Sequence, residues 1–91
     1  MTIGPTYDVR LSDAAARSLR KLPRDARAKL NAKLLTLAAN PRPHGSKKLK
    51  GANDLHRIRS GNYRILYSIE DNKLIVYIVA IGDRKDVYEG L

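Results

Sequence analysis

Three closely spaced arginines carry the chemistry that this sequence suggests most clearly. Arg57 and Arg59 flank Ile58, and Arg64 follows shortly after the turn signal Ser60-Gly61. A guanidinium group remains charged at physiological pH, and its planar fork of donors matches the oxygens of a phosphate group. No acidic residue stands among these arginines, so their grouping predicts a phosphate-binding surface.

A basic segment that contains Lys47, Lys48 and Lys50 precedes the arginines. The complete chain of 91 residues holds 18 Lys and Arg against 9 Asp and Glu, which gives a net charge of +9. A positive field of this strength favours a polyphosphate partner, although an acidic protein would also fit. No long amphipathic segment ends in aromatic anchors, so a membrane partner is disfavoured. A simple solvated loop is the alternative interpretation of the lysines.

The composition limits the fold and excludes several kinds of site. A length of 91 residues predicts a single domain that spans residues 1–91. The chain has no cysteine and two histidines, His44 and His56, so disulfides are impossible and we expect neither a metal site nor a cofactor. The first residues show no positive charge followed by an apolar run, and no segment reaches the roughly 18 apolar residues of a membrane span. We therefore expect a cytoplasmic protein.

The elements that must position the arginines can be predicted from hydrophobic periodicity. Alternating apolar residues predict a strand over residues 7–11, and Ser12 is a typical N-cap for the helix that follows. Pro23 ends this helix and opens a second one, which has one apolar stripe and stops at Asn40-Pro41. Three strands are predicted over 55–59, 63–69 and 74–81, before a tail over 84–91. The order β-α-α-β-β-β predicts an α+β fold, with a helix hairpin packed on one face of an antiparallel four-stranded sheet.

Two predicted turns decide which strand residues share a face. With Ser60-Gly61 as a two-residue turn, Arg57 faces Arg64, and Arg59 joins them on the side away from the helices. Like charges that face each other are destabilising, so this arrangement favours a phosphate site, although solvated arginines are the plain alternative. With Asp71-Asn72 as the other turn, the pairs predicted on the helix side are Ile69–Leu74, Tyr67–Val76, Ile65–Ile78 and Tyr63–Ala80.

Two ring side chains are assigned by the same alternation. Tyr77 falls on the side away from the helices, where it could stack on a base or pack beneath the tail. His56 falls on the helix side, and we expect it to be a residue of the core or of its rim.

Three motifs together resemble the RelE branch of the RelE/ParE toxin superfamily. They are the loop Lys47-Lys48-Leu49-Lys50-Gly51, the strand Tyr63-Arg64-Ile65-Leu66-Tyr67 and the terminal run Arg84-Lys85-Asp86-Val87-Tyr88. Leu22-Pro23 and Asn40-Pro41 also fit, so the resemblance covers nearly the whole chain. Each motif alone is weak, but the combination is fairly specific.

The resemblance implies the RelE-like microbial ribonuclease fold and a toxin of a type II toxin–antitoxin system. RelE-like members cut mRNA, typically in the ribosomal A site, without a metal ion and through attack by the 2′-OH on the adjacent phosphate. The implied partners are therefore mRNA, the ribosome and an acidic, RelB-like antitoxin, with operator DNA bound only by the toxin–antitoxin complex.

The resemblance also implies roles for individual residues. Arg64 and Arg84 would hold the scissile phosphate, and Tyr88 would orient the nucleotide or take part in proton transfer. Arg57 and Arg59 stand where the familiar RelE pattern has lysines, and an arginine does not readily lose its proton. The general base therefore stays open between Tyr88, a loop lysine (Lys48 or Lys50) and an atypical arginine. No histidine stands near the terminal motif, which disfavours the Glu/His pair of some relatives.

Two other function classes compete with the ribonuclease. ParE-like toxins share the fold but bind and poison DNA gyrase, and they lack the ribonuclease residue set. Arg57, Arg59, Arg64, Arg84 and Tyr88 occur together here, which favours the RelE-like alternative. A non-catalytic nucleic-acid-binding module is the second rival.

Overall fold

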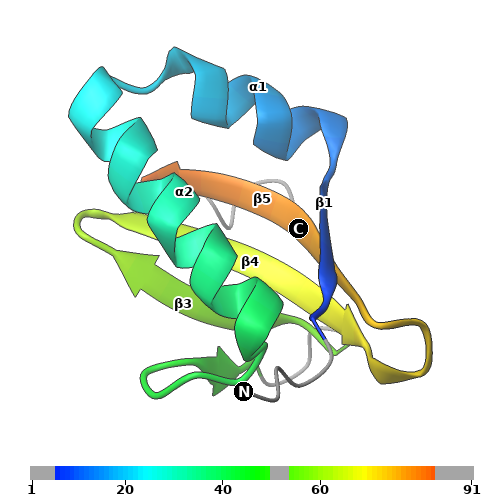
Figure 1. The fold of residues 1–91 in the computed structure, drawn as a ribbon. Helices are drawn as coiled ribbons and strands as arrows, with labels where there is room; N and C mark the ends of the chain where they lie inside the picture. The colour runs from blue at the N-terminus through cyan, green and yellow to red at the C-terminus, as the bar shows by residue number, and fades with distance from the viewer. Residues whose placement is uncertain (1–5, 50–53, 84–91) are drawn as a thin grey trace, which may run out of the picture.

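The computed structural model describes residues 6–49 and 54–83 (Figure 1). Neither helix within these ranges is long and apolar enough to cross a membrane. The elements, in chain order, are β1 (Asp8–Leu11), α1 (Asp13–Lys21), α2 (Arg24–Ala39), β2 (Lys47–Lys48), β3 (His56–Ser60), β4 (Tyr63–Glu70), a 3₁₀ turn (Asp71–Lys73) and β5 (Ile75–Asp83).

The described strands form one mixed sheet in the order β1-β5-β4-β3-β2, and both helices lie over the same face of it (Figure 1). The predicted α+β class and helix hairpin are thus confirmed. The prediction of an antiparallel four-stranded sheet is wrong in two respects. β1 pairs with β5 in parallel, and the long connection that parallel pairing requires contains both helices and the strands β2 to β4. The short strand β2 adds a fifth member beside β3.

The N-terminus of α1 is attached to the sheet at Ser12, whose backbone N–H donates to the Ile78 carbonyl oxygen at 2.9 Å. As predicted, Ser12 is the N-cap: its Oγ accepts a hydrogen bond from the Ala15 backbone N–H at 3.0 Å. The same hydroxyl donates to the carbonyl oxygen of Val79 at 2.7 Å. Ser12 therefore both begins the helix and joins it to β5.

The core lies between α2 and the sheet. Helix residues at intervals of three and four, Leu30, Leu34 and Leu37, are buried, as their periodicity predicts. Removing such apolar surface from water is the main source of stability in a protein of this size. The buried residues that these leucines join are Ala15, Ile58, Ile65, Tyr67, Val76, Ile78 and Ile81.

The turn between β3 and β4 is Gly61-Asn62, one residue later than predicted. Gly61 has a φ of 62°, a left-handed conformation that glycine adopts without steric cost and that suits the first position of a tight hairpin. As a result Arg59, rather than Arg57, lies directly opposite Arg64, so the predicted Arg57–Arg64 pair is wrong. The pairing is shifted by an even number of residues, so every side chain keeps its predicted face.

The connection between β4 and β5 is longer than the predicted two-residue turn. Asp71–Lys73 form a 3₁₀ turn, and Leu74 ends it with a left-handed φ of 54°. An irregularity between Leu66 and Tyr67 then shifts the register of β5 by one more residue. All four predicted pairs are therefore wrong, and the observed pairs are Ile69–Val76, Tyr67–Ile78, Leu66–Ala80, Ile65–Ile81 and Tyr63–Asp83.

Candidate functional site

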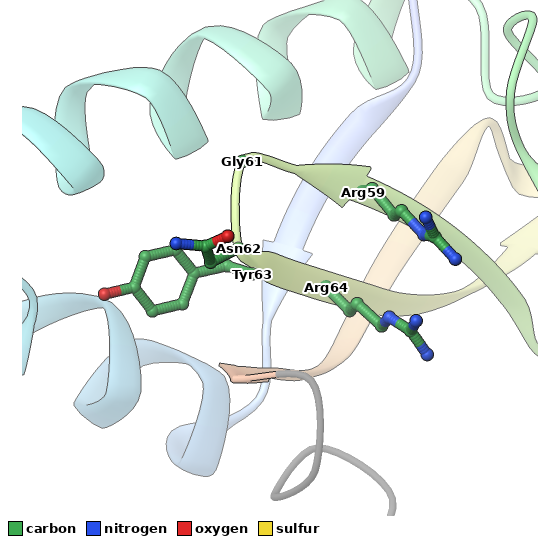
Figure 2. A pocket seen from close by; sticks show the side chains of 5 residues that line it. All are labelled: Arg59, Gly61, Asn62, Tyr63 and Arg64. Carbon is green, nitrogen blue, oxygen red and sulfur yellow. The ribbon is translucent and has the colours of Figure 1, made fainter.

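The face of the sheet away from the helices carries a pair of arginines. Arg59 on β3 lies directly opposite Arg64 on β4, and each stands next to a buried core residue, Ile58 or Ile65, that points the other way. Figure 2 shows the two guanidinium groups extending in the same direction from neighbouring strands. Together with the Gly61-Asn62 turn and Tyr63 they line a cavity of about 200 Å³. We call the side of the sheet that carries Arg57, Arg59 and Arg64 the arginine face.

Arg57 lies one row further along the arginine face. Its cross-strand partner is Leu66, which is fully buried although it faces away from the helices. Within the part of the chain that the structure describes, the Arg57 Nε–H is buried and has no hydrogen-bond partner. An unsatisfied buried donor costs about 1–3 kcal/mol, and more when it is charged. An anionic oxygen that reached this donor would remove that cost.

Opposite Arg64 on its other side lies Gly82 of β5. Glycine has no side chain, so nothing from this position stands beside the Arg64 guanidinium. Gly82 has no role predicted from the sequence, and its place beside Arg64 follows from the strand register.

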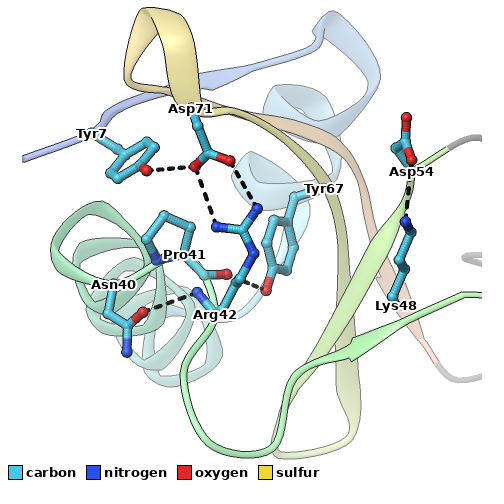
Figure 3. Close-up of polar contacts among 8 residues, drawn as sticks. All are labelled: Tyr7, Asn40, Pro41, Arg42, Lys48, Asp54, Tyr67 and Asp71. Atoms are coloured by element: carbon cyan, nitrogen blue, oxygen red, sulfur yellow. Dashed lines mark hydrogen bonds and ion pairs between the residues drawn. The ribbon is translucent and has the colours of Figure 1, made fainter.

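The two lysines of β2 are placed on different sides of the sheet. Lys47 pairs with Arg57 and so belongs to the arginine face, whereas Lys48 pairs with His56 on the helix side. The Lys48 ammonium forms an exposed ion pair with Asp54 at 3.4 Å (Figure 3). Of the predicted site residues, Arg57, Arg59, Arg64 and Lys47 are thus brought together. Lys50, Arg84 and Tyr88 lie outside the described residues.

His56 is held away from the arginine face by Tyr67. Their rings stack with centroids 5.5 Å apart, which confirms the predicted position of His56 on the helix side at the edge of the core. Burial lowers the pKa of His56, and the nearby cations Arg42 and Lys48 lower it further. His56 is therefore neutral at pH 7 and is not part of the arginine site.

A polar network that the sequence analysis did not predict lies at the other end of β4 (Figure 3). Asp71 accepts two hydrogen bonds from the Arg42 guanidinium, at 3.0 and 3.2 Å, and a third from the Tyr7 hydroxyl at 2.6 Å. These bonds, that from Arg42 first, hold the pKa of Asp71 below its usual range. We call Tyr7, Arg42 and Asp71 the Asp71 network. Its members are 29 and 64 residues apart, so no local sequence signal reveals it.

Comparison with known proteins agrees with this fold. The family described as the ParE toxin of type II toxin-antitoxin systems (parDE) matches residues 9–88. The mRNA interferase toxin RelE of Escherichia coli K12 is 33% identical over 86 residues, which are 90% of each chain. Among solved structures, the RelBE2 toxin-antitoxin complex of Mycobacterium tuberculosis superposes with a TM-score of 0.79 at 30% identity, covering 91% of this chain and 97% of that one. The intact E. coli RelBE complex gives 0.75 at 31% identity, covering 87% and 98%.

These matches span nearly the whole chain and agree with one another. The chain belongs to the RelE/ParE superfamily of type II toxin-antitoxin toxins, in its RelE-like branch.

Proposed function

We propose that this toxin is a metal-independent endoribonuclease that cuts mRNA in the ribosomal A site and so inhibits translation. The observation that carries the proposal is the cross-strand pair of Arg59 and Arg64 on the arginine face. Like charges in this position cost stability, and a bound phosphate would turn that cost into a favourable interaction. The relatives named mRNA interferases support the same activity.

Because the 2′-hydroxyl of the RNA is the nucleophile, the main task of the site is to stabilise the negative charge that develops on the phosphate. The 2′-oxygen bonds to the adjacent phosphorus, the bond from phosphorus to the 5′-oxygen breaks, and a 2′,3′-cyclic phosphate remains. One proton leaves the 2′-hydroxyl and another reaches the departing 5′-oxygen. Arg64 and Arg84 would hold the phosphate as its negative charge grows, and one such donor contributes about 3–4 kcal/mol in a catalytic site. Arg57 and Arg59 would add charge, and Lys47 would bind the RNA beside them.

The placement of Lys48 argues against one of the candidates for the general base. Lys48 lies on the helix side of the sheet and is paired with Asp54, which makes it a poor base for an RNA on the arginine face. Tyr88 would orient the nucleotide and take up the 2′-proton, because neighbouring cations lower the pKa of a tyrosine. Lys50, next to this basic strand in sequence, is the second candidate for the base and a further RNA contact.

The proposed partners follow from the relatives. Structures similar to this chain are complexes of RelE with the antitoxin RelB. An acidic, RelB-like antitoxin would neutralise a toxin whose net charge is +9, and operator DNA would be bound through that complex. Because the proposed substrate is mRNA on translating ribosomes, the toxin would act in the cytoplasm.

The test is to incubate the purified toxin with translating ribosomes and to map the mRNA ends. The wild type is expected to cut at codon-specific positions, and Arg64→Ala to reduce cleavage by about 100-fold or more. The control is Arg17→Ala. Arg17 is an exposed residue of α1, so its replacement removes the same charge away from the arginine face, and this variant should cut mRNA normally. Intact mRNA together with gyrase-linked DNA breaks would overturn the proposal in favour of a ParE-like activity.

A further inference from the structure

Two side-chain contacts anchor the start of the segment from Pro41 to Lys48, one at Arg42 and one at Pro41. The first is the Asp71 network, in which Arg42 makes a two-pronged ion pair with Asp71 while Tyr7 donates to the same carboxylate (Figure 3). A two-pronged arginine–carboxylate pair fixes direction as well as distance, because both donors lie in one plane. Arg42 is therefore held in one orientation against the β4–β5 connection.

The second contact is made by the hydroxyl group of Tyr67. The Tyr67 side chain is fully buried, and its hydroxyl donates to the carbonyl oxygen of Pro41 at 2.8 Å. Its ring stacks on His56, which is the cross-strand partner of both Tyr67 and Lys48. Tyr67, His56 and Lys48 thus form one row across three strands, and that row ends at β2.

β2 is weakly attached to the sheet. It consists of two residues at the edge of the sheet, and its ladder to β3 is limited to two residue pairs. It is also held by a hydrogen bond from the Leu49 N–H to the Leu55 carbonyl oxygen at 2.8 Å and by the exposed Lys48–Asp54 ion pair. So short a strand at an exposed edge still opens easily, since little buried apolar area resists opening. The position of Lys47 beside Arg57 depends on how the preceding segment is anchored.

We propose that the Asp71 network is a positioning device for RNA binding: with the Tyr67 hydroxyl it holds β2 so that Lys47 stands on the arginine face. The network itself lies beyond the opposite end of β4 from Arg64 and would not touch the scissile phosphate. Its loss would weaken RNA binding more than it slows the bond-breaking step. This inference rests on the proposed function, because the ligand that Lys47 meets is RNA.

The chain offers a matched pair of substitutions to test this. Asp71→Asn breaks the ion pair with Arg42, whose two side chains are both 53% exposed. Asp8→Asn breaks the ion pair with Arg10, whose side chains are 61% and 60% exposed. Both variants lose one negative charge, so a general electrostatic effect on RNA binding would be the same in each. The readouts are KM and kcat for cleavage of mRNA on programmed ribosomes, with circular dichroism to verify folding.

We expect Asp71→Asn to raise KM about fivefold to tenfold, the order expected when one charge-assisted phosphate contact is weakened. Its kcat should change less than about twofold, and Asp8→Asn should match the wild type in both constants. Should Asp71→Asn fail to fold, Tyr7→Phe removes a single hydroxyl from the same network and serves in its place. A KM for Asp71→Asn equal to that of Asp8→Asn, with cleavage intact, would overturn the positioning role and leave the proposed function standing.

A double variant shows whether the network acts through Lys47. Lys47→Ala should raise KM about fivefold to tenfold in the wild type but less than about twofold in the Asp71→Asn background, because the two substitutions then remove the same contact. Independent, multiplied effects would contradict action through Lys47. A wild type that neither cuts nor binds RNA would overturn the proposed function itself, and the positioning role with it.

Discussion

Charged side chains are arranged in opposite ways at the two ends of β4. Near its start, Arg64 faces another arginine, Arg59, across the β3–β4 ladder. Just beyond its end, Asp71 is bonded to Arg42 and to Tyr7. At the Asp71 end opposite charges are matched, as they are when an arrangement serves the fold. At the arginine end like charges are brought together, which the fold alone would not favour. The proposed function accounts for this difference, because a bound phosphate would compensate the like charges of the two arginines.

The arginine end also contains the buried donor that lacks a partner. Arg57 Nε is without a hydrogen-bond partner in the described residues, whereas the Asp71 carboxylate accepts three hydrogen bonds. Unsatisfied buried donors are rare in folded proteins, and each calls for an explanation such as strain, a catalytic role or a bound water or ion. Three substitutions test this contrast, from the largest expected effect to the smallest.

The largest effect is expected when an acidic residue replaces Arg59, so that opposite charges face each other at the arginine end as they do at the Asp71 end. Arg59→Glu places a carboxylate directly opposite Arg64, and a cross-strand pair of opposite charges is worth about 0.2–1 kcal/mol relative to a neutral pair. The free energy of unfolding should therefore rise slightly, while mRNA cleavage falls by about 100-fold or more because the new carboxylate repels phosphate and occupies Arg64. Urea denaturation and cleavage on programmed ribosomes measure the two effects.

The control for Arg59→Glu is Arg17→Glu on α1, which changes the net charge by the same amount away from the arginine face. It should retain cleavage. A protein that is both more stable and fully active after Arg59→Glu would contradict a phosphate site at this pair.

The next effect is expected at the buried Tyr67 hydroxyl. Tyr67→Phe removes the donor to the Pro41 carbonyl oxygen without changing the ring that stacks on His56. A buried acceptor left without a partner costs about 1–3 kcal/mol, so the free energy of unfolding should fall by that amount. Tyr77→Phe is the matched control, because Tyr77 is 41% exposed and water can replace any bond that its hydroxyl makes. Equal urea midpoints for the two variants would show that the Pro41 bond contributes nothing to stability.

The faces of β3 and β4 could be predicted from the sequence, although the strand register could not. On β5 the prediction that Ala80 lies on the helix side is wrong, because the irregularity after Leu66 places Ala80 opposite Leu66 on the arginine face. Ile58 alternates with Arg57 and Arg59, and Ile65 and Tyr67 lie two residues apart on the same face of β4. A face assignment of this kind survives a register shift of two. Arg57, Arg59 and Arg64 were therefore assigned to the correct side even though the predicted partner of Arg64 was wrong. The register itself depends on turn conformations, and a left-handed Leu74 has no sequence signature.

Other features could not be predicted, because no local sequence pattern encodes them. β2 is two lysines in a loop, with no apolar period, and it is a strand only because β3 offers a free edge. The separation of Lys47 from Lys48 follows from that pairing. The Asp71 network joins residues that only the folded sheet brings together, so composition around Arg42 or Asp71 carries no trace of it.

The smallest of the three effects is the pH dependence of the Asp71 end. The hydrogen bonds from Arg42 and Tyr7 hold the pKa of Asp71 below its usual range, so the folded protein binds fewer protons at this group than the unfolded chain does near pH 4. The stabilisation is thus present above the unfolded pKa of about 3.9 and is lost as the pH falls through the lower, folded value. The difference in Tm between wild type and Asp71→Asn should be present at pH 7 and shrink below about pH 4.

Thermal unfolding of wild type, Asp71→Asn and Asp8→Asn across pH 7 to about pH 3 measures this difference, and Asp8→Asn accounts for the loss of one exposed carboxylate elsewhere. A gap for Asp71→Asn that stays constant down to the lowest pH would mean that the charge of Asp71 does not hold the network together. A guanidinium group is a permanent cation, so acid does not relieve the repulsion within a cross-strand pair of arginines such as Arg59 and Arg64. Acid therefore acts on one end of β4: it weakens the Asp71 network and leaves the charge of the proposed phosphate site unchanged.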